Sequence, residues 1–148
     1  MNQNQLLILK RGDELISSIK KYCQKNKIVS AWFTGLGAAS KAKLAIYDLE
    51  NKEYIFRDVQ GPFEITNITG NVGTKDGEIA LHCHITLSNK DMDCIGGHVD
   101  NLEVSGTCEI IFRPLEKKII RKYDSDTGNR YAGPCECRTG IILKPQHE

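Results

Sequence analysis

The stretch from residue 78 to residue 98 holds three of the four histidines and constrains the fold more than any other part of the chain. Between Ile79 and Leu87, apolar or β-branched residues occupy nearly every odd position, a pattern that predicts a strand. Because side chains alternate between the two faces of a strand, His82 and His84 lie on the same face. The opposite face carries the residues expected in the core, which are Leu81, Cys83, Ile85 and Leu87.

A predicted turn at residues 89–91 then returns the chain to His98. Gly96 and Gly97 tolerate backbone angles that other residues resist, so His98 can turn toward the pair on the strand. Three neutral imidazoles with an open fourth position are the ligand set of catalytic zinc sites. His82, His84 and His98 are therefore the predicted ligands of zinc or a similar divalent transition metal. The alternative interpretation is that the strand histidines share an exposed face by chance.

A second strand, predicted from Phe63 to Val72, joins the histidine strand through a hairpin turn at residues 75–77. Glu64 is the only acidic residue in that second strand. Because the two strands are expected to be antiparallel neighbours, Glu64 is the candidate catalytic residue, as a partner of a ligand or a proton carrier beside the metal. A solvent-exposed strand glutamate is the alternative.

The charge of the chain is nearly balanced, with 20 basic and 19 acidic residues among 148. This balance does not provide the broad positive field that sequence-independent DNA binding usually needs. A local basic cluster is nevertheless the candidate DNA-binding surface, and it consists of Lys117, Lys118, Arg121 and Lys122. An edge strand protected from aggregation by lysine explains the same cluster equally well.

The remaining pattern predicts a single α+β domain over residues 1–148, built on a largely antiparallel sheet. One amphipathic helix is expected to begin at Asp13 and Glu14, because acidic groups favour the positive end of the helix dipole, and to end near Asn26. The other expected elements are strands at 3–10, 28–36, 41–48, 53–58, 103–112, 117–123 and 139–143, with a loop at 124–133.

Six cysteines raise the question of the redox compartment. The sequence shows no secretory signal and no apolar stretch of about 18 residues that would predict a membrane span. We therefore expect a cytoplasmic protein with reduced thiols and no membrane partner. Cys135 and Cys137 form a C-x-C pair without the two-residue spacer of zinc knuckles, and the sequence leaves their role open.

Several short motifs resemble the PPC domain family, which is conserved in plants and prokaryotes. They are R-G-D-E-L at 11–15, G-L-G-A at 35–38, G-x-F-E-I at 61–65, G-N-V at 70–72, D-G at 76–77, L-H-C-H-I-T-L-S at 81–88 and I-G-G-H at 95–98. The resemblance covers residues 6–127. It departs from the family pattern at Pro62, where an arginine is usual, and in the atypical C-terminal extension at 129–148.

The resemblance implies a homotrimer of compact α+β subunits. It also implies a fold shared with acetolactate decarboxylase and with a zinc ester hydrolase. By the same resemblance, His82, His84 and His98 would be the metal ligands. Plant members carry an AT-hook beside the domain, but its R-G-R-P core does not occur here. Free-standing prokaryotic members are commonly described as candidate DNA-binding proteins.

Two function classes follow from these observations. The first is a regulatory module that binds DNA or a protein and contains a three-histidine metal site. The alternative is a zinc-dependent hydrolase or lyase that acts on a small oxygenated substrate, with Glu64 as the proton carrier.

Overall fold

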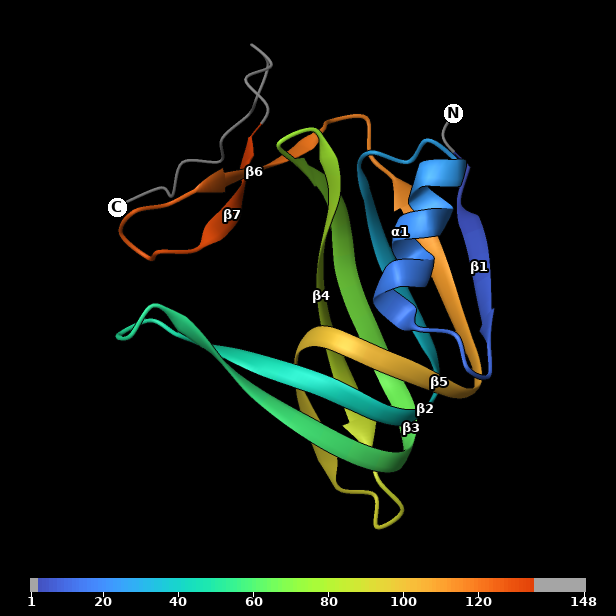
Figure 1. Ribbon diagram of the computed structural model, residues 1–148. Coiled ribbons are helices and arrows are strands. Elements are labelled where there is room, and N and C mark those ends of the chain that lie inside the picture. The colour runs from blue at the N-terminus through green and yellow to red at the C-terminus, as the bar shows by residue number, and fades with distance from the viewer. Residues whose placement is uncertain (1–2, 135–148) are drawn as a thin grey trace, which may run out of the picture.

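The computed structural model describes residues 3–134, which form one helix and seven strands (Figure 1). In chain order they are β1 (Gln5–Lys10), α1 (Leu15–Lys25), β2 (Ala31–Asp48), β3 (Glu53–Lys75), β4 (Glu78–Ser88), β5 (Cys94–Pro114), β6 (Ile119–Tyr123) and β7 (Arg130–Pro134). The strand expected at 139–143, together with Cys135 and Cys137, lies outside the described residues.

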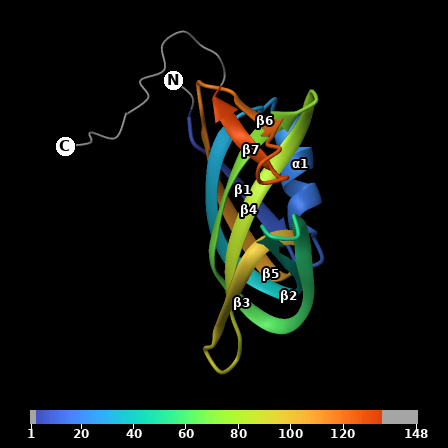
Figure 2. The ribbon, with the colours of Figure 1, turned by 90° about the vertical axis from the view of Figure 1, so that its left-hand side faces the viewer.

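All seven strands belong to one sheet with the order β1-β5-β2-β3-β6-β7, and β4 pairs with both β3 and β5. The pairings among β2, β3, β4 and β5 therefore close into a circuit, which gives the molecule the elongated, strongly curved body seen in Figure 2. Every pairing in the described chain is antiparallel except the contact of β3 with β6. The predicted α+β fold with a largely antiparallel sheet is confirmed.

Helix α1 begins where the acidic residues predicted it. The carboxylate of Glu14 caps the helix by accepting hydrogen bonds from the backbone N–H of Ile16 at 2.9 Å and of Ser17 at 2.6 Å. These bonds satisfy two of the N–H groups that a helix leaves without partners in its first turn. Asn26 is the C-cap. The apolar side of the helix is buried against the sheet through Leu15, Ile19 and Cys23.

The core combines this helix face with the inward side chains of the long strands. Its largest fully buried side chains include Phe33, Phe112, Ile68, Leu87 and Leu102. The Phe33 and Phe112 rings pack with their centroids 5.4 Å apart. On the histidine strand, Cys83, Ile85 and Leu87 are buried as predicted, while Leu81 is half-buried against the core, and the histidines lie on the other face.

The long strands run further than the sequence pattern predicts. β2 joins the expected strands at 28–36 and 41–48 into one element, and β3 continues through Gly61 and Pro62. The β2–β3 ladder shifts register near Gly37 and again beside Ser40. Such bulges bend a strand without ending it. Glycine and proline therefore mark bends here, and the predicted separation of the strands at 53–58 and 63–72 is wrong.

The described chain ends in a hairpin, β6–β7, which lies beside the end of β3. The predicted strand at 117–123 is present as β6, but the predicted loop at 124–133 is wrong in its second half, where β7 pairs with β6. The hairpin meets β3 at Gly73, where an added Cβ would lie only 2.7 Å from the backbone oxygen of Ile119. Within residues 3–134, no helix is long and apolar enough to cross a membrane.

Candidate metal centre

The strand register brings the three predicted ligands together. His84 on β4 pairs directly with His98 on β5, and His82 lies two residues before His84 on the same face. One ligand nitrogen from each imidazole lies within 4.8 Å of the others. The ring centroids are 4.8 Å apart for His82 and His84, 5.5 Å for His82 and His98, and 5.7 Å for His84 and His98. Imidazoles at this spacing can share one metal ion.

Tight backbone packing fixes the position of His98. A Cβ added to Gly96 would lie 2.5 Å from the backbone oxygen of Ile85, and one added to Gly97 would lie 2.8 Å from that of Ala45. Neither glycine has a positive φ angle. The two glycines are therefore needed for close approach of β5 to β4 and β2, and the predicted need for unusual backbone angles is wrong.

The surroundings keep the imidazoles of His82 and His98 neutral. Partial burial, together with positive charge on His84, Arg121 and His98, lowers the pKa of His82 to about 4. Burial also lowers the pKa of His98, an effect that His84 strengthens and Asp100 opposes. A neutral imidazole retains the lone pair that binds a metal, so both groups are ready to act as ligands at neutral pH.

One nitrogen at the centre has no partner. The Nδ1 atom of His98 is buried and makes no hydrogen bond with any described residue. Buried polar groups in native proteins are nearly always hydrogen-bonded, so an orphan of this kind calls for an explanation. A bound cation would provide one.

A cavity of about 220 Å³ opens beside His82 and His98. Its lining residues are Tyr54, Lys75, Ala80, Leu81, His82, His98, Arg121, Asn129 and Arg130. The ring of Tyr54 lies 5.3 Å from that of His98, between centroids. The hydroxyl of Tyr54 accepts a hydrogen bond of 3.4 Å from the Asn129 amide.

Arg121 joins the histidine centre through Asn71. The Nη2 atom of Arg121 donates a hydrogen bond to Oδ1 of Asn71. Asn71 is 9% exposed and pairs across the β3–β4 ladder with His82. Directly paired residues of an antiparallel ladder point to the same face, so the amide and the imidazole are neighbours.

The structure does not bring Glu64 to the histidines. β3 is the antiparallel neighbour of β4, as predicted, but the register pairs Glu64 with Ser88 and His84 with Thr69. Ser88, the partner of Glu64, therefore lies four positions along β4 from His84, a span of about 13 Å along a strand. Tyr54 and Arg121 line the cavity beside the imidazoles together with Lys75, Asn129 and Arg130, and Asn71 binds Arg121 next to His82.

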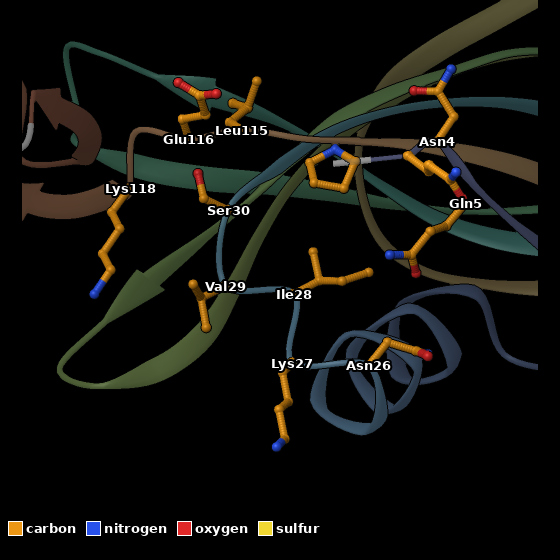
Figure 3. Close-up of a pocket in the computed structure, with 12 residues that line it drawn as sticks. Asn4, Gln5, Asn26, Lys27, Ile28, Val29, Ser30, Leu115, Glu116 and Lys118 are labelled. Carbon is orange, nitrogen blue, oxygen red and sulfur yellow. The ribbon is translucent and has the colours of Figure 1, made fainter. Parts of the chain in front are cut away.

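The four basic residues of the predicted DNA-binding surface do not all line the same cavity. Arg121 lines the histidine cavity, whereas Lys118 lines a different cavity of about 480 Å³ between the N-terminal residues, the loop after α1 and residues 114–118 (Figure 3). In Figure 3 the Lys118 side chain lies beside Ser30 and Val29. Lys117 and Lys122 are exposed. Lys118 and Arg121 therefore lie at different cavities although they are close in the sequence.

Sequence reasoning placed all three histidines and missed the groups around them. Asn71 and Arg121 are 50 residues apart in the chain, and Tyr54 belongs to a strand that was predicted to end at Asp58. Contacts across such separations leave no local pattern. Only the alternation along β6, which places Arg121 and Lys122 on opposite faces, could have indicated that these two basic residues differ.

Solved structures of similar chains share this fold. A metal-containing protein of Archaeoglobus fulgidus is 32% identical, with a TM-score of 0.83 over 88% of this chain and 93% of that one. A protein of Ralstonia eutropha described as a candidate DNA-binding protein is 28% identical, with a TM-score of 0.81 over 86% and 89%. A plant- and prokaryote-conserved (PPC) protein of Pyrococcus horikoshii is 29% identical, with a TM-score of 0.83 over 92% and 94%.

A weaker similarity concerns the fold alone. Acetolactate decarboxylase of Bacillus subtilis is 14% identical, with a TM-score of 0.55 over 86% of this chain and 59% of that one. No curated protein sequence matches this chain significantly. The family model of the Plants and Prokaryotes Conserved (PCC) domain matches residues 2–116, a span that contains α1, β1 to β5 and all three histidines of the centre. The chain therefore belongs to the PCC domain family.

Proposed function

We propose that this PCC-domain protein, a single domain, binds one zinc ion or a similar divalent transition metal through His82, His84 and His98. The observation that carries the proposal is the convergence of three imidazole nitrogens within 4.8 Å. The residues fit the ion, because His82 and His98 are held neutral and the buried Nδ1 of His98 lacks a partner among the described residues. Three histidines leave a fourth position open, as in catalytic rather than structural zinc sites.

Elemental analysis of purified protein, before and after zinc is added back, tests this proposal. We expect about one zinc per subunit in the wild type and almost none in His98→Ala, because two imidazoles alone are a poor zinc site. Thr86→Ala is the matched control, since Thr86 lies on the same face of β4 beyond His84 and should leave the zinc content unchanged. Wild-type protein without zinc after addition would overturn the proposal.

A small oxygenated ligand is the proposed partner of the metal. Zinc held by three imidazoles supplies Lewis acidity toward such a ligand. The chain itself contributes Tyr54 and Arg121 to the cavity lining and Asn71 as the partner of Arg121, which supports a zinc-dependent hydrolase or lyase as one form of this function. Glu64 can carry protons for the reaction only if another subunit or a movement brings it closer. Glu64→Gln is therefore expected to leave zinc content unchanged, and a loss of zinc would indicate a direct role at the centre.

DNA binding is the second candidate function. It is supported by the description of the Ralstonia eutropha protein and by the exposed Lys117, Lys118 and Lys122 near β6. Electrostatic binding must weaken with salt, with a log–log slope of about −0.9 per phosphate contacted. Fluorescence anisotropy of duplex DNA at several salt concentrations measures this slope. Replacing Lys117, Lys118, Arg121 and Lys122 by Met should reduce it, and salt-resistant binding by that variant would exclude this surface.

A homotrimer is the proposed assembly. The arm formed by β2 and β3, which extends away from the helix in Figure 1, exposes Ile46 by 67% and Ile55 by 53%. These side chains line an apolar hollow of about 470 Å³ together with Leu44, Val59 and Ile95. Contiguous apolar surface of this kind marks protein–protein contacts. Sedimentation should give a trimer for the wild type and smaller species for Ile46→Asp, whereas a wild-type monomer at micromolar concentration would contradict the assembly.

A cytoplasmic location is also proposed. The four cysteines of the described residues are free thiols, and Cys23, Cys83 and Cys108 are buried. Free thiols are typical of a reducing compartment.

A further inference from the structure

The cavity beside the histidines is lined by an excess of positive charge. Arg121 and Arg130 come from the β6–β7 hairpin and Lys75 comes from the end of β3, while no aspartate or glutamate is among the described lining residues. Arg130 has an ion-pair partner in Asp76, but the atoms are 3.9 Å apart and the Asp76 side chain is 76% exposed. An exposed pair of this kind compensates little of the positive charge.

Arg121 is held in place with most of its donors unused. It is half-buried, and its only hydrogen-bond partner among the described residues is the Asn71 amide oxygen. Gly73 allows β6 to approach β3 closely enough for this bond, because a side chain there would collide with Ile119. A guanidinium group carries five N–H donors in one plane, so the group can still bind an anion through two parallel hydrogen bonds.

The hairpin that carries both arginines lies beyond residue 116, where the family match ends. The loop that connects β6 to β7 is hydrogen-bonded to the β2–β3 arm on the other side of the cavity. The Tyr47 hydroxyl donates to the backbone oxygen of Thr127 at 2.8 Å, and the Lys52 ammonium donates to that of Ser125 at 3.1 Å. The hairpin thus spans from β3 to the arm and brings its cations to one side of the histidine centre.

We propose that this cavity binds a small carboxylate or phosphate anion, with Arg121 as the binding residue that contacts it beside the metal. The volume of about 220 Å³ is below the range of about 300–1,000 Å³ for drug-sized ligands, so the anion is small. The inference rests on the proposed metal centre in one respect only, which is that the bound anion would contact the metal as well as Arg121. The cation cluster of Lys75, Arg121 and Arg130 is present independently of the metal.

Isothermal titration with oxalate and, separately, with inorganic phosphate tests the proposal on zinc-loaded and on metal-free protein. Comparison of the two anions distinguishes a carboxylate from a phosphate ligand. We expect Arg121→Met to weaken binding of the preferred anion about tenfold or more in both metal states, since a charge-assisted hydrogen bond is lost. Arg121→Lys should lose less affinity because it keeps the charge. Lys122→Met is the matched control, because Lys122 is the next residue of β6 and faces away from the cavity.

Zinc content of each variant separates this inference from the metal proposal. Arg121→Met with normal zinc content and weakened anion binding supports the inference. Unchanged affinity in that variant, or wild-type protein that binds neither anion at millimolar concentration in either metal state, overturns the inference and leaves the metal proposal standing. If the wild type binds no zinc, the titrations of metal-free protein still show whether the cavity binds an anion through Arg121. If Arg121→Met does not fold, Arg130→Met decides in its place, with a several-fold loss of affinity expected and an unchanged affinity contradicting the proposal.

Discussion

The histidine centre and the β6–β7 hairpin face the same cavity but are held very differently. The histidines stand on β4 and β5 within the closed circuit of strands, and the residues behind them, Cys83, Ile85 and Val99, are buried. Within residues 3–134, the hairpin pairs with the main sheet only where Ile120 of β6 meets Thr74 of β3. Its other polar contacts with the described chain are the Arg130–Asp76 ion pair and side-chain hydrogen bonds, such as the one that the backbone N–H of Ile119 donates to the Ser30 hydroxyl at 3.2 Å.

This difference suggests a division of labour. Metal binding requires several ligands at fixed positions, and strands packed on a buried core provide them. Choice among ligands requires only that suitable groups reach the open side of the site, which a peripheral hairpin can provide and can vary. The family match includes the histidines and ends before the hairpin, in agreement with that division.

Truncation of one isoleucine in each region should give the largest difference between them in the free energy of unfolding. Ile85 is 3% exposed and lies behind the histidines, whereas Ile120 in the hairpin is only half-buried. We expect Ile85→Ala to reduce the free energy of unfolding by about 2–5 kcal/mol. Ile120→Ala should cost about 1 kcal/mol or less, because less apolar surface is removed from contact. Urea denaturation measures both, and equal losses would contradict the distinction between a rigid centre and a peripheral hairpin.

A smaller effect is expected where the two regions meet. Gly73→Ala places a Cβ within 2.8 Å of the Cγ2 atom of Ile119, so β6 must shift away from β3. Overpacking of this kind costs about 1–3 kcal/mol. Because the displaced strand carries Arg121 away from Asn71, anion affinity should fall while zinc content stays normal. Loss of zinc in this variant would show that the hairpin also supports the metal ligands.

The pH dependence of stability should separate the regions further. In the metal-free protein the pKa of His82 is lowered to about 4, whereas an unfolded chain gives histidine a pKa of about 6.5. Between these values the unfolded state binds more protons, so stability falls as the pH falls from about 6.5 to about 4. Urea denaturation of metal-free protein across this range should show a shallower decline for His82→Gln than for the wild type. At pH 8 the stability that depends on the lowered pKa of His82 is fully present. Equal slopes of the free energy of unfolding against pH in the two proteins, below pH 6.5, would contradict that lowered pKa.

The sequence was sufficient to predict the parts of the fold that depend on local pattern. Alternation predicted which side of β4 is buried, and the acidic residues before Leu15 predicted the start of α1. The histidine centre was predicted because its members lie on a strand, a turn and the returning strand, so that short-range geometry brings them together. Strand continuity was not predicted, since Gly61 and Pro62 resemble a chain break unless the bulge beside Ser40 is known.

The remainder of the site depends on contacts that no local pattern encodes. Arg121 reaches Asn71 because Gly73 allows two strands to approach, and nothing in the residues around Arg121 indicates this. Glu64 shows the opposite case, in which the correct neighbouring strand was predicted but the register was not. One strand can slide along another while keeping its buried face, and only the complete ladder fixes which residues meet.

The smallest effect is expected at Lys122, which lies on the opposite face of β6 from Arg121. Lys122 is exposed and alternates with Arg121, so it faces away from the cavity. Lys122→Met should change the free energy of unfolding by no more than about 0.5 kcal/mol, as for most surface substitutions. Zinc content and anion affinity should not change, but the salt dependence of any DNA binding should decrease by about one phosphate contact. A marked loss of anion affinity in this variant would show that general positive charge, rather than the placement of Arg121, attracts the ligand.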